Sequence, residues 1–165
     1  MSANPLRLRE LLEQLVEAEI RFVLVGGLAV NAWGYLRGTQ DVDVVPDPDP
    51  GNLARLDELL RQLGGKVDVE GRLLDSDAIS TFLRTGDRTF VRTDLGQVDV
   101  LQGLPQVPRY EALDQQAKAI DIDGLDVRVC SLEHLLEMKR ASSRPRDHED
   151  IQELEAAQKQ DGERS

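Results

Sequence analysis

The pattern of apolar positions along the chain predicts alternating helices and strands. From Leu6 to Ile20, leucines and a valine recur at helical spacing with charged residues between them, which indicates an amphipathic helix. The continuous apolar run Phe22–Val25 is typical of a buried strand, and a short helix that ends near Tyr35 is expected after it. Residues 41–45 alternate between acidic and apolar, as on a strand with one buried face.

Further helices are predicted in both halves of the remaining chain. Asn52 is expected to cap a helix that ends at about Leu63, and glycines follow it. Ser131 is expected to cap another helix, which ends at about Ala141. A last helix follows, and the polar residues beyond Ala157 are expected to fray.

Glycine turns predict two β-hairpins. One joins the strand Arg88–Thr93 to the strand Gln97–Leu101, and the other has Asp123-Gly124 at its turn with Leu125–Val129 as the return strand. No pattern assigns residues 66–83 to a clear element. The expected fold class is therefore α/β, with a mixed, twisted sheet and helices packed behind it.

Three aspartates lie between strand-like valines, where aspartate is disfavoured. Asp41 and Asp43 share one face of their strand, and Asp99 faces them if its strand is a neighbour. Adjacent carboxylates repel each other unless a cation lies between them, so the pattern favours a divalent-metal site over the alternative of a polar outer face on an edge strand. Asp121 and Asp123 have the same spacing but are interpreted as hairpin residues.

Three more positions favour an anionic ligand, each with a structural alternative. Gly26 and Gly27 precede a helix and would let a phosphate approach the backbone, although alone they fit turn geometry better. Lys139 falls on the apolar stripe of its helix, so it either meets an anion or extends past the edge of the core. Asp147 is either a helix N-cap or a residue of the site.

Composition limits the class of protein. The 165 residues fit one domain, expected over residues 1–157, followed by a polar tail at 158–165. A net charge of −11 disfavours non-specific binding to polyanions, although the basic stretch 139–146 could still bind RNA. The single cysteine, Cys130, excludes an internal disulfide. No signal peptide or membrane span is recognised, and a cytoplasmic location is expected.

Taken together, these motifs resemble the DNA polymerase β-like nucleotidyltransferase superfamily. Its members have a strand that ends in Gly-Gly or Gly-Ser, a short helix, an Asp-x-Asp strand and a third acid on a later strand. The Arg-x-Thr-x-Asp-x-Asp form of residues 37–43 looks closest to small bacterial members grouped with abortive-infection and type IV toxin nucleotidyltransferases. The resemblance extends over residues 21–154 and is loose from 46 to 83.

The resemblance implies a fold, a reaction and site residues. The reaction would move a nucleoside monophosphate from an NTP to an acceptor hydroxyl and release pyrophosphate. Asp41, Asp43 and Asp99 would be catalytic and would hold Mg²⁺, as two ions, with Mn²⁺ as an alternative. The nucleotide-binding residues would be Gly26, Gly27, Arg37, Thr39, Lys139 and Asp147.

The acceptor and the partners stay open at this stage. RNA such as a tRNA 3′ end, a protein hydroxyl and a small molecule are all candidate acceptors, and an antitoxin or toxin partner is a further candidate. The oligomeric state and the base of the NTP are not indicated. The alternative function is a non-catalytic nucleotide- or partner-binding protein that keeps the fold, and the three intact carboxylates argue against it.

Overall fold

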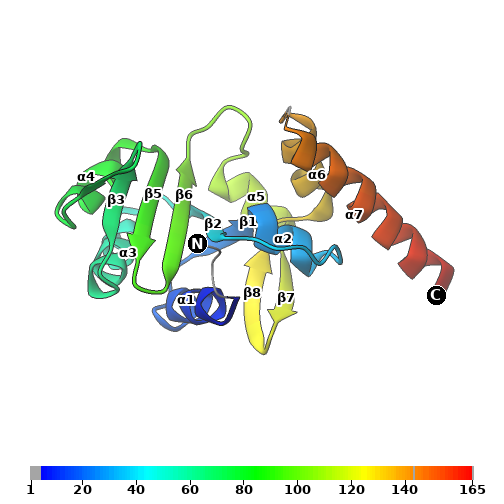
Figure 1. The fold of residues 1–165 in the computed structure, drawn as a ribbon, viewed down its shortest axis with the longest axis horizontal. Coiled ribbons are helices and arrows are strands. Elements are labelled where there is room, and N and C mark those ends of the chain that lie inside the picture. Colours follow the sequence, from blue (N-terminus) through cyan, green and yellow to red (C-terminus); the bar gives the residue numbers. More distant parts are fainter. Residues whose placement is uncertain (1–4, 143, 165) are drawn as a thin grey trace.

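The computed structural model describes residues 5–142 and 144–164. It consists of one mixed sheet with helices around it (Figure 1). The strands are β1 (Phe22–Val25), β2 (Asp41–Pro46), β3 (Lys66–Val69), β4 (Arg72–Leu74), β5 (Asp87–Thr93), β6 (Gly96–Gln102), β7 (Lys118–Ile122) and β8 (Leu125–Val129). The helices are α1 (Pro5–Glu17), α2 (Gly26–Ala32), α3 (Pro50–Gln62), α4 (Ala78–Thr85), α5 (Tyr110–Gln116), α6 (Leu132–Arg140) and α7 (Pro145–Arg164). The expected α/β class is confirmed.

The sheet mixes parallel and antiparallel neighbours in the order β4-β3-β5-β6-β2-β1-β8-β7. Strand β2 lies between β1, to which it is antiparallel, and β6, to which it is parallel. Both predicted hairpins are present, as β5–β6 and β7–β8. At the second turn the Asp121 carboxylate accepts a hydrogen bond from the Gly124 N–H, which confirms the structural interpretation of that acid.

The core lies between the sheet and helices from both halves of the chain. Every residue of β1 is buried, and α1 packs Leu11, Leu12 and Leu15 against β2, β6 and β8. In β2, Val42 and Val44 are buried whereas the alternating aspartates are half-buried, as the period of two predicts. The valines therefore anchor the strand in the core and leave the acids on the opposite face.

Two predicted element ends are wrong, and local contacts explain them. Helix α3 begins at Pro50, because the Asp49 carboxylate rather than Asn52 caps it by accepting from the Asn52 N–H. The Asn52 side chain is buried and bonds to both backbone groups of Arg21. At the other end of the chain, the residues expected to fray are helical, because α7 continues to Arg164 and extends away from the body (Figure 1).

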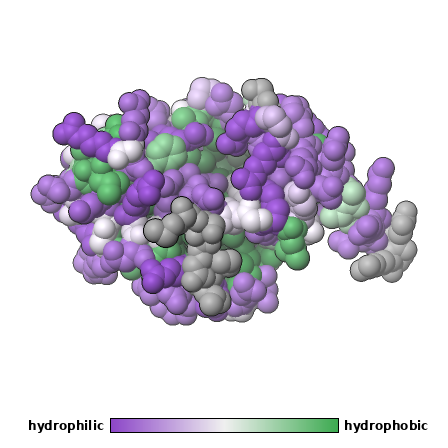
Figure 2. Space-filling view, viewed as in Figure 1, coloured by the Kyte–Doolittle hydropathy of each residue, from purple (hydrophilic) through white to green (hydrophobic). Residues whose placement is uncertain are grey.

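Smaller differences concern the unassigned tract and the first turn. Residues 66–83 contain β3 and β4, which extend the sheet on the β5 side, and most of helix α4. Helix α2 begins directly at Gly26 and ends at Ala32, earlier than the predicted end near Tyr35. Figure 2 shows a face covered mostly by hydrophilic side chains. Among the described residues, none of the helices combines the length and apolar character that a membrane crossing needs.

Candidate active site

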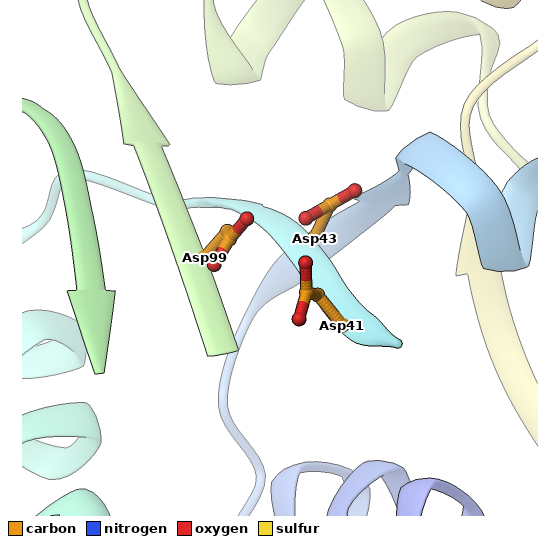
Figure 3. A group of neighbouring side chains, drawn as sticks. All are labelled: Asp41, Asp43 and Asp99. Carbon is orange, nitrogen blue, oxygen red and sulfur yellow. The ribbon is translucent and has the colours of Figure 1, made fainter. Parts of the chain in front are cut away.

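The three aspartates predicted from the sequence lie side by side on two neighbouring strands (Figure 3). Strands β2 and β6 are parallel, and their register pairs Asp43 directly with Asp99. Asp41 lies two residues before Asp43 and so shares its face of the sheet. One oxygen of each carboxylate lies within 4.8 Å of the other two. Because the strand period and the register act together, no loop movement is needed to assemble this triad.

Burial and mutual repulsion raise the pKa of all three carboxyl groups. Burial, and then the nearby charge of Asp43, raise the pKa of Asp99 to about 7. Burial also raises the pKa of Asp43, and burial with the charge of Asp99 raises that of Asp41. The Gln97 amide donates a hydrogen bond of 2.7 Å to Asp99, which opposes part of this effect. The triad therefore holds more negative charge than its own surroundings neutralise.

The glycine pair lies against this triad and has no space for side chains. A Cβ atom on Gly26, whose φ is +69°, would come within 1.8 Å of the Asp43 carboxylate. A Cβ atom on Gly27 would lie 2.4 Å from the Thr39 hydroxyl. Gly26 thus meets two independent requirements for glycine, a left-handed backbone and close contact with an acid. The backbone at the start of α2 consequently lies directly beside the carboxylates.

Arg37 and Thr39 lie on the segment that leads into β2. The Arg37 guanidinium donates two hydrogen bonds to the buried carboxylate of Asp150, at 2.7 and 3.0 Å. A third bond goes to the Gly38 carbonyl. The Thr39 hydroxyl lies 3.4 Å from the Asp41 carbonyl, to which it donates. These contacts hold one cation and one hydroxyl next to Gly27.

Lys139, at the end of the apolar stripe of its helix, is buried and contacts carboxylates. Of the two alternatives, contact with an anion is therefore correct, and the side chain does not extend past the edge of the core. Its ammonium lies 3.0 Å from an Asp147 oxygen and 2.9 Å from an Asp150 oxygen. Asp147 also accepts from the Ser142 hydroxyl and from Arg144. It therefore lies in the first turn of α7 as the centre of an ion-pair network, and is not the N-cap.

The partners of these two aspartates lower their pKa values. Burial alone would raise the pKa of Asp147, but hydrogen bonds from Arg144, Ser142 and Lys139 lower it to about 2. Burial would likewise raise the pKa of Asp150, and hydrogen bonds from Arg37 and Lys139 lower it. This network is thus neutralised from within the protein, unlike the triad.

All the site residues predicted from the sequence line one pocket of about 210 Å³, which we call the phosphate pocket after the ligand that the sequence predicts for it. They are Gly26, Gly27, Arg37, Thr39, Asp41, Asp43, Asp99, Lys139 and Asp147. Gln40, Arg144 and Arg146 complete its lining. The two added arginines come from the basic stretch 139–146, which the sequence indicates as attractive to phosphate. The pocket thus joins the acidic face of the sheet to the cations of α6, α7 and the segment before β2.

Three residues near the pocket were not singled out from the sequence. Asp150 pairs with both Arg37 and Lys139, and its position three residues after Asp147 on one helix face was an available signal. Gln97 lies two residues before Asp99 and shares its strand face, which was a similar signal. Arg88 resembles any exposed strand arginine, and nothing in the sequence pattern distinguishes it.

Comparison with solved structures places this fold among nucleotidyltransferases. The lincosamide antibiotic adenylyltransferase LnuA, in a lincomycin-bound structure, has a TM-score of 0.68 and 17% identity, with 95% of this chain and 99% of that one covered. The enzyme ANT(2″)-Ia, in complex with adenylyl-2″-tobramycin, has a TM-score of 0.58 and 15% identity, with 95% of each chain covered. A nucleotidyltransferase-like antigen of Paracoccidioides brasiliensis has a TM-score of 0.60 and 20% identity, over 95% and 77% of the chains.

At these identities the structural likeness concerns the fold alone. No curated protein sequence matches the chain. A family model does match, over residues 4–164, and its description is "Nucleotidyl transferase of unknown function (DUF2204)". Since the match spans nearly the whole chain, and the fold and the acid triad agree with it, this protein belongs to the nucleotidyl transferase family DUF2204.

Proposed function

We propose that this protein transfers a nucleoside monophosphate from an NTP to an acceptor hydroxyl and releases pyrophosphate. The observation that carries the proposal is the register pairing of Asp43 with Asp99, beside Asp41, at the edge of a pocket lined by four cations. An acid triad alone could serve many metal sites. An acid triad that faces a cluster of arginines and a lysine suits a metal-bound polyphosphate.

The donor set fits a divalent metal. Its ligands would be the carboxylates of Asp41, Asp43 and Asp99, and carboxylate oxygens are the ligands that Mg²⁺ prefers. Bound Mg²⁺, as two ions, or Mn²⁺ in its place, would neutralise the triad and polarise the α-phosphate. Burial and the repulsion among the carboxylates raise the pKa values of the triad, and a bound cation would supply the counter-charge that offsets both effects.

The phosphate pocket is suited to the triphosphate only when that counter-charge is present. Arg37, Lys139, Arg144 and Arg146 line it, and so do four carboxylates, those of the triad and Asp147. With all four carboxylates ionised, the lining therefore has no net charge. The N–H groups at Gly26 and Gly27 and the hydroxyl of Thr39, which line this pocket, would donate to phosphate oxygens. Nucleotide binding should consequently require the divalent ion.

The transfer step needs one proton acceptor on the hydroxyl side. The acceptor oxygen forms a bond to the α-phosphorus, while the bond from that phosphorus to the bridging oxygen breaks and its electron pair leaves with pyrophosphate. Asp99, which reaches the site from β6 and not with the Asp41–Asp43 pair, accepts the hydroxyl proton in this proposal. Arg37 and Lys139 neutralise the charge that develops on the leaving pyrophosphate.

The experiment separates nucleotide binding from transfer in Asp99→Asn. We expect Mg²⁺-dependent NTP affinity, measured by calorimetry, to stay within about tenfold of the wild type, a difference of roughly 1.4 kcal/mol. The rate of single-turnover transfer of labelled NMP to acceptors in a whole-cell extract should fall far more, because activation of the acceptor hydroxyl is lost. Equal losses in both measurements, or none, would contradict this division of labour. Asp94→Asn, at an exposed turn outside the pocket, is the matched control.

A metal and nucleotide titration tests the alternative of a non-catalytic binding protein. A ligand that binds only the native state must raise the melting temperature, so Mg²⁺ with at least one NTP should stabilise the protein. The adenylyl groups named for the similar structures make ATP the first nucleotide to test. Absence of stabilisation by any NTP would favour the binding protein. The predicted toxin–antitoxin role and protein partners stay predictions.

A further inference from the structure

A second pocket opens beside the acid triad. Its volume is about 460 Å³, and it shares with the phosphate pocket the lining residues Gly26, Asp43, Asp99, Lys139, Arg144 and Asp147. Unlike the phosphate pocket, it has apolar walls from the sheet, the loop after β6 and helix α6 with the residue after it: Val25, Leu101, Val107, Leu135, Met138 and Ala141. We call it the apolar-walled pocket. Its volume lies in the range of roughly 300–1,000 Å³ that is usual for small-molecule sites.

The geometry of the proposed transfer reaction indicates which substrate this pocket receives. That assignment rests on the proposed function. In an in-line displacement the attacking oxygen and the leaving pyrophosphate lie on opposite sides of the α-phosphorus. The cations Arg37 and Arg146 line the phosphate pocket and not the apolar-walled pocket, so the pyrophosphate is assigned to the phosphate pocket. The attacking hydroxyl is then expected to approach from the apolar-walled pocket, whose lining also includes Asp99.

Arg88 is a cation that lines this pocket and not the phosphate pocket. It pairs with Leu101 across β5 and β6, two residues beyond Asp99, so its side chain shares the face of the triad. It lines the apolar-walled pocket together with Asp43 and Asp99. Within the described chain Arg88 has no ion-pair partner, whereas the pocket's other cations, Lys139 and Arg144, are paired with Asp147.

In the described part of the chain, the lining of the pocket has no free carboxylate that could pair with a cationic ligand as Arg88 could pair with an anionic one. The carboxylates in its lining are those of Asp43, Asp99 and Asp147. The first two belong to the metal site, and the third is already bound by Lys139 and Arg144. An ammonium group placed here would face Arg88 with no carboxylate left to pair with it.

We propose that the apolar-walled pocket binds the acceptor, and that the acceptor is a small hydroxyl compound with an apolar body and an anionic group that pairs with Arg88. The apolar walls of α6 and β6 contact the body, and the guanidinium of Arg88 holds a carboxylate or phosphate. The hydroxyl oxygen bonds to the α-phosphorus, its proton goes to Asp99, and pyrophosphate leaves through the phosphate pocket. A nucleic-acid acceptor is disfavoured, because the chain has a net charge of −11.

The test uses an extract of the source organism from which macromolecules have been removed. The extract is divided on ion exchangers at neutral pH into anionic, neutral and cationic compounds. Each fraction is then incubated with the full-length protein, Mg²⁺ and α-labelled NTP. We expect label to enter compounds of the anionic fraction. In a parallel reaction the removed RNA and protein are added back. The proposal would be overturned if label entered mainly compounds of the neutral or cationic fraction, entered none of the fractions, or entered only the RNA or protein.

Two variants connect the result to the pocket. Arg88→Glu should lower acceptor-dependent transfer by about tenfold or more, as expected for loss of a charge-assisted contact, while NTP affinity changes by less than about threefold. Arg72→Glu, the same reversal at an exposed position of β4 outside both pockets, should leave transfer unchanged. Unchanged transfer in Arg88→Glu would overturn the role of Arg88.

Met138→Trp tests which substrate fills the pocket. Met138 is half-buried in the pocket wall, so a larger side chain would occupy acceptor space. We expect the acceptor KM to rise while NTP affinity stays the same. If NTP affinity falls instead, the pocket holds the nucleoside and the acceptor assignment is wrong. If the wild-type protein shows no Mg²⁺-dependent NTP binding at all, the proposed function itself fails, which is a separate outcome.

Discussion

Two groups of aspartates lie at or next to the phosphate pocket, and their environments shift their pKa values in opposite directions. Asp41, Asp43 and Asp99 come from strands, lie beside one another and have raised pKa values. Asp147 and Asp150 come from α7, lie against Lys139 and two arginines, and have lowered pKa values. We call them the strand triad and the helix pair.

The two groups differ in what neutralises them, which suits them to different roles. The helix pair is neutralised by cations of the same chain, and these ion pairs hold α6, α7 and the Arg37 segment together. Among the described residues the strand triad forms no ion pair, and its repulsion is tolerated because buried valines hold both strands in the core. Uncompensated carboxylates are suited to an external cation, and compensated ones are suited to positioning other groups.

The largest expected effect is on catalysis, from the strand triad. Asp41→Ala and Asp43→Ala should each lower transfer by roughly three orders of magnitude, because metal activation contributes several kcal/mol at about 1.4 kcal/mol per tenfold. The melting temperature of the metal-free protein should stay the same or rise, because repulsion is relieved. Single-turnover transfer and a thermal melt in EDTA measure the two effects. Full transfer with Mg²⁺ still required would remove these residues from the site.

The helix pair should instead respond with a loss of stability. Lys139→Met leaves Asp147 and Asp150 buried without their shared cation, and breaking such a pair costs about 3–5 kcal/mol. Adding Asp150→Asn should restore part of this loss. The free energy of unfolding in urea measures both. Lys118→Met, at an exposed strand position, is the control, and an equal effect in the two lysine variants would contradict the structural role.

The two groups should also give opposite pH dependence in the metal-free protein. The folded pKa of Asp99 is about 7 against an unfolded value of about 3.9, so stability should rise as pH falls from about 7 to about 4. The folded pKa of Asp147 is about 2, so its contribution of about 2–3 kcal/mol is present above pH 4 and is lost as pH falls toward 2.

Unfolding free energies measured in EDTA from pH 2 to 8 test this pattern. Asp99→Asn should flatten the limb above pH 4 and keep the limb below it. Asp147→Asn should do the reverse, from a lower starting stability. If both substitutions change the same limb, the two groups are coupled and the comparison does not hold.

The smallest effect is expected at the glycine beside the strand triad. Gly26→Ala places a Cβ atom against Asp43 in a left-handed backbone, which costs about 1–2 kcal/mol and displaces that carboxylate. Gly38→Ala, where nothing lies within 4 Å, should cost less. Calorimetry with Mn²⁺ should show weaker metal binding in the first variant alone. Equal affinities in both variants would show that Asp43 does not need this close contact.

Some features followed from the sequence because they depend on neighbours in the chain. The period of two puts Asp41 and Asp43 on one face, and Gly124 and Ser131 mark a hairpin turn and a helix start, as the structure confirms. Asn52 shows the limit of this reasoning. It has the side chain of a helix cap, but contacts with Arg21 and Asp47 occupy it, so Asp49 is the cap.

The Asp41–Asp43 pair, the glycine turn and the fold class could thus be predicted from the sequence, because each depends on a local period or a short motif. Long-range packing set the rest: Asp99 pairs in register with Asp43, Lys139 is buried between two aspartates, Arg37 binds a carboxylate 113 residues away, and Arg88 has no ion-pair partner among the described residues. Those outcomes depend on which distant charges the packed helices and strands bring within contact. Electrostatic partners are set by distance in space, and sequence spacing does not encode that distance.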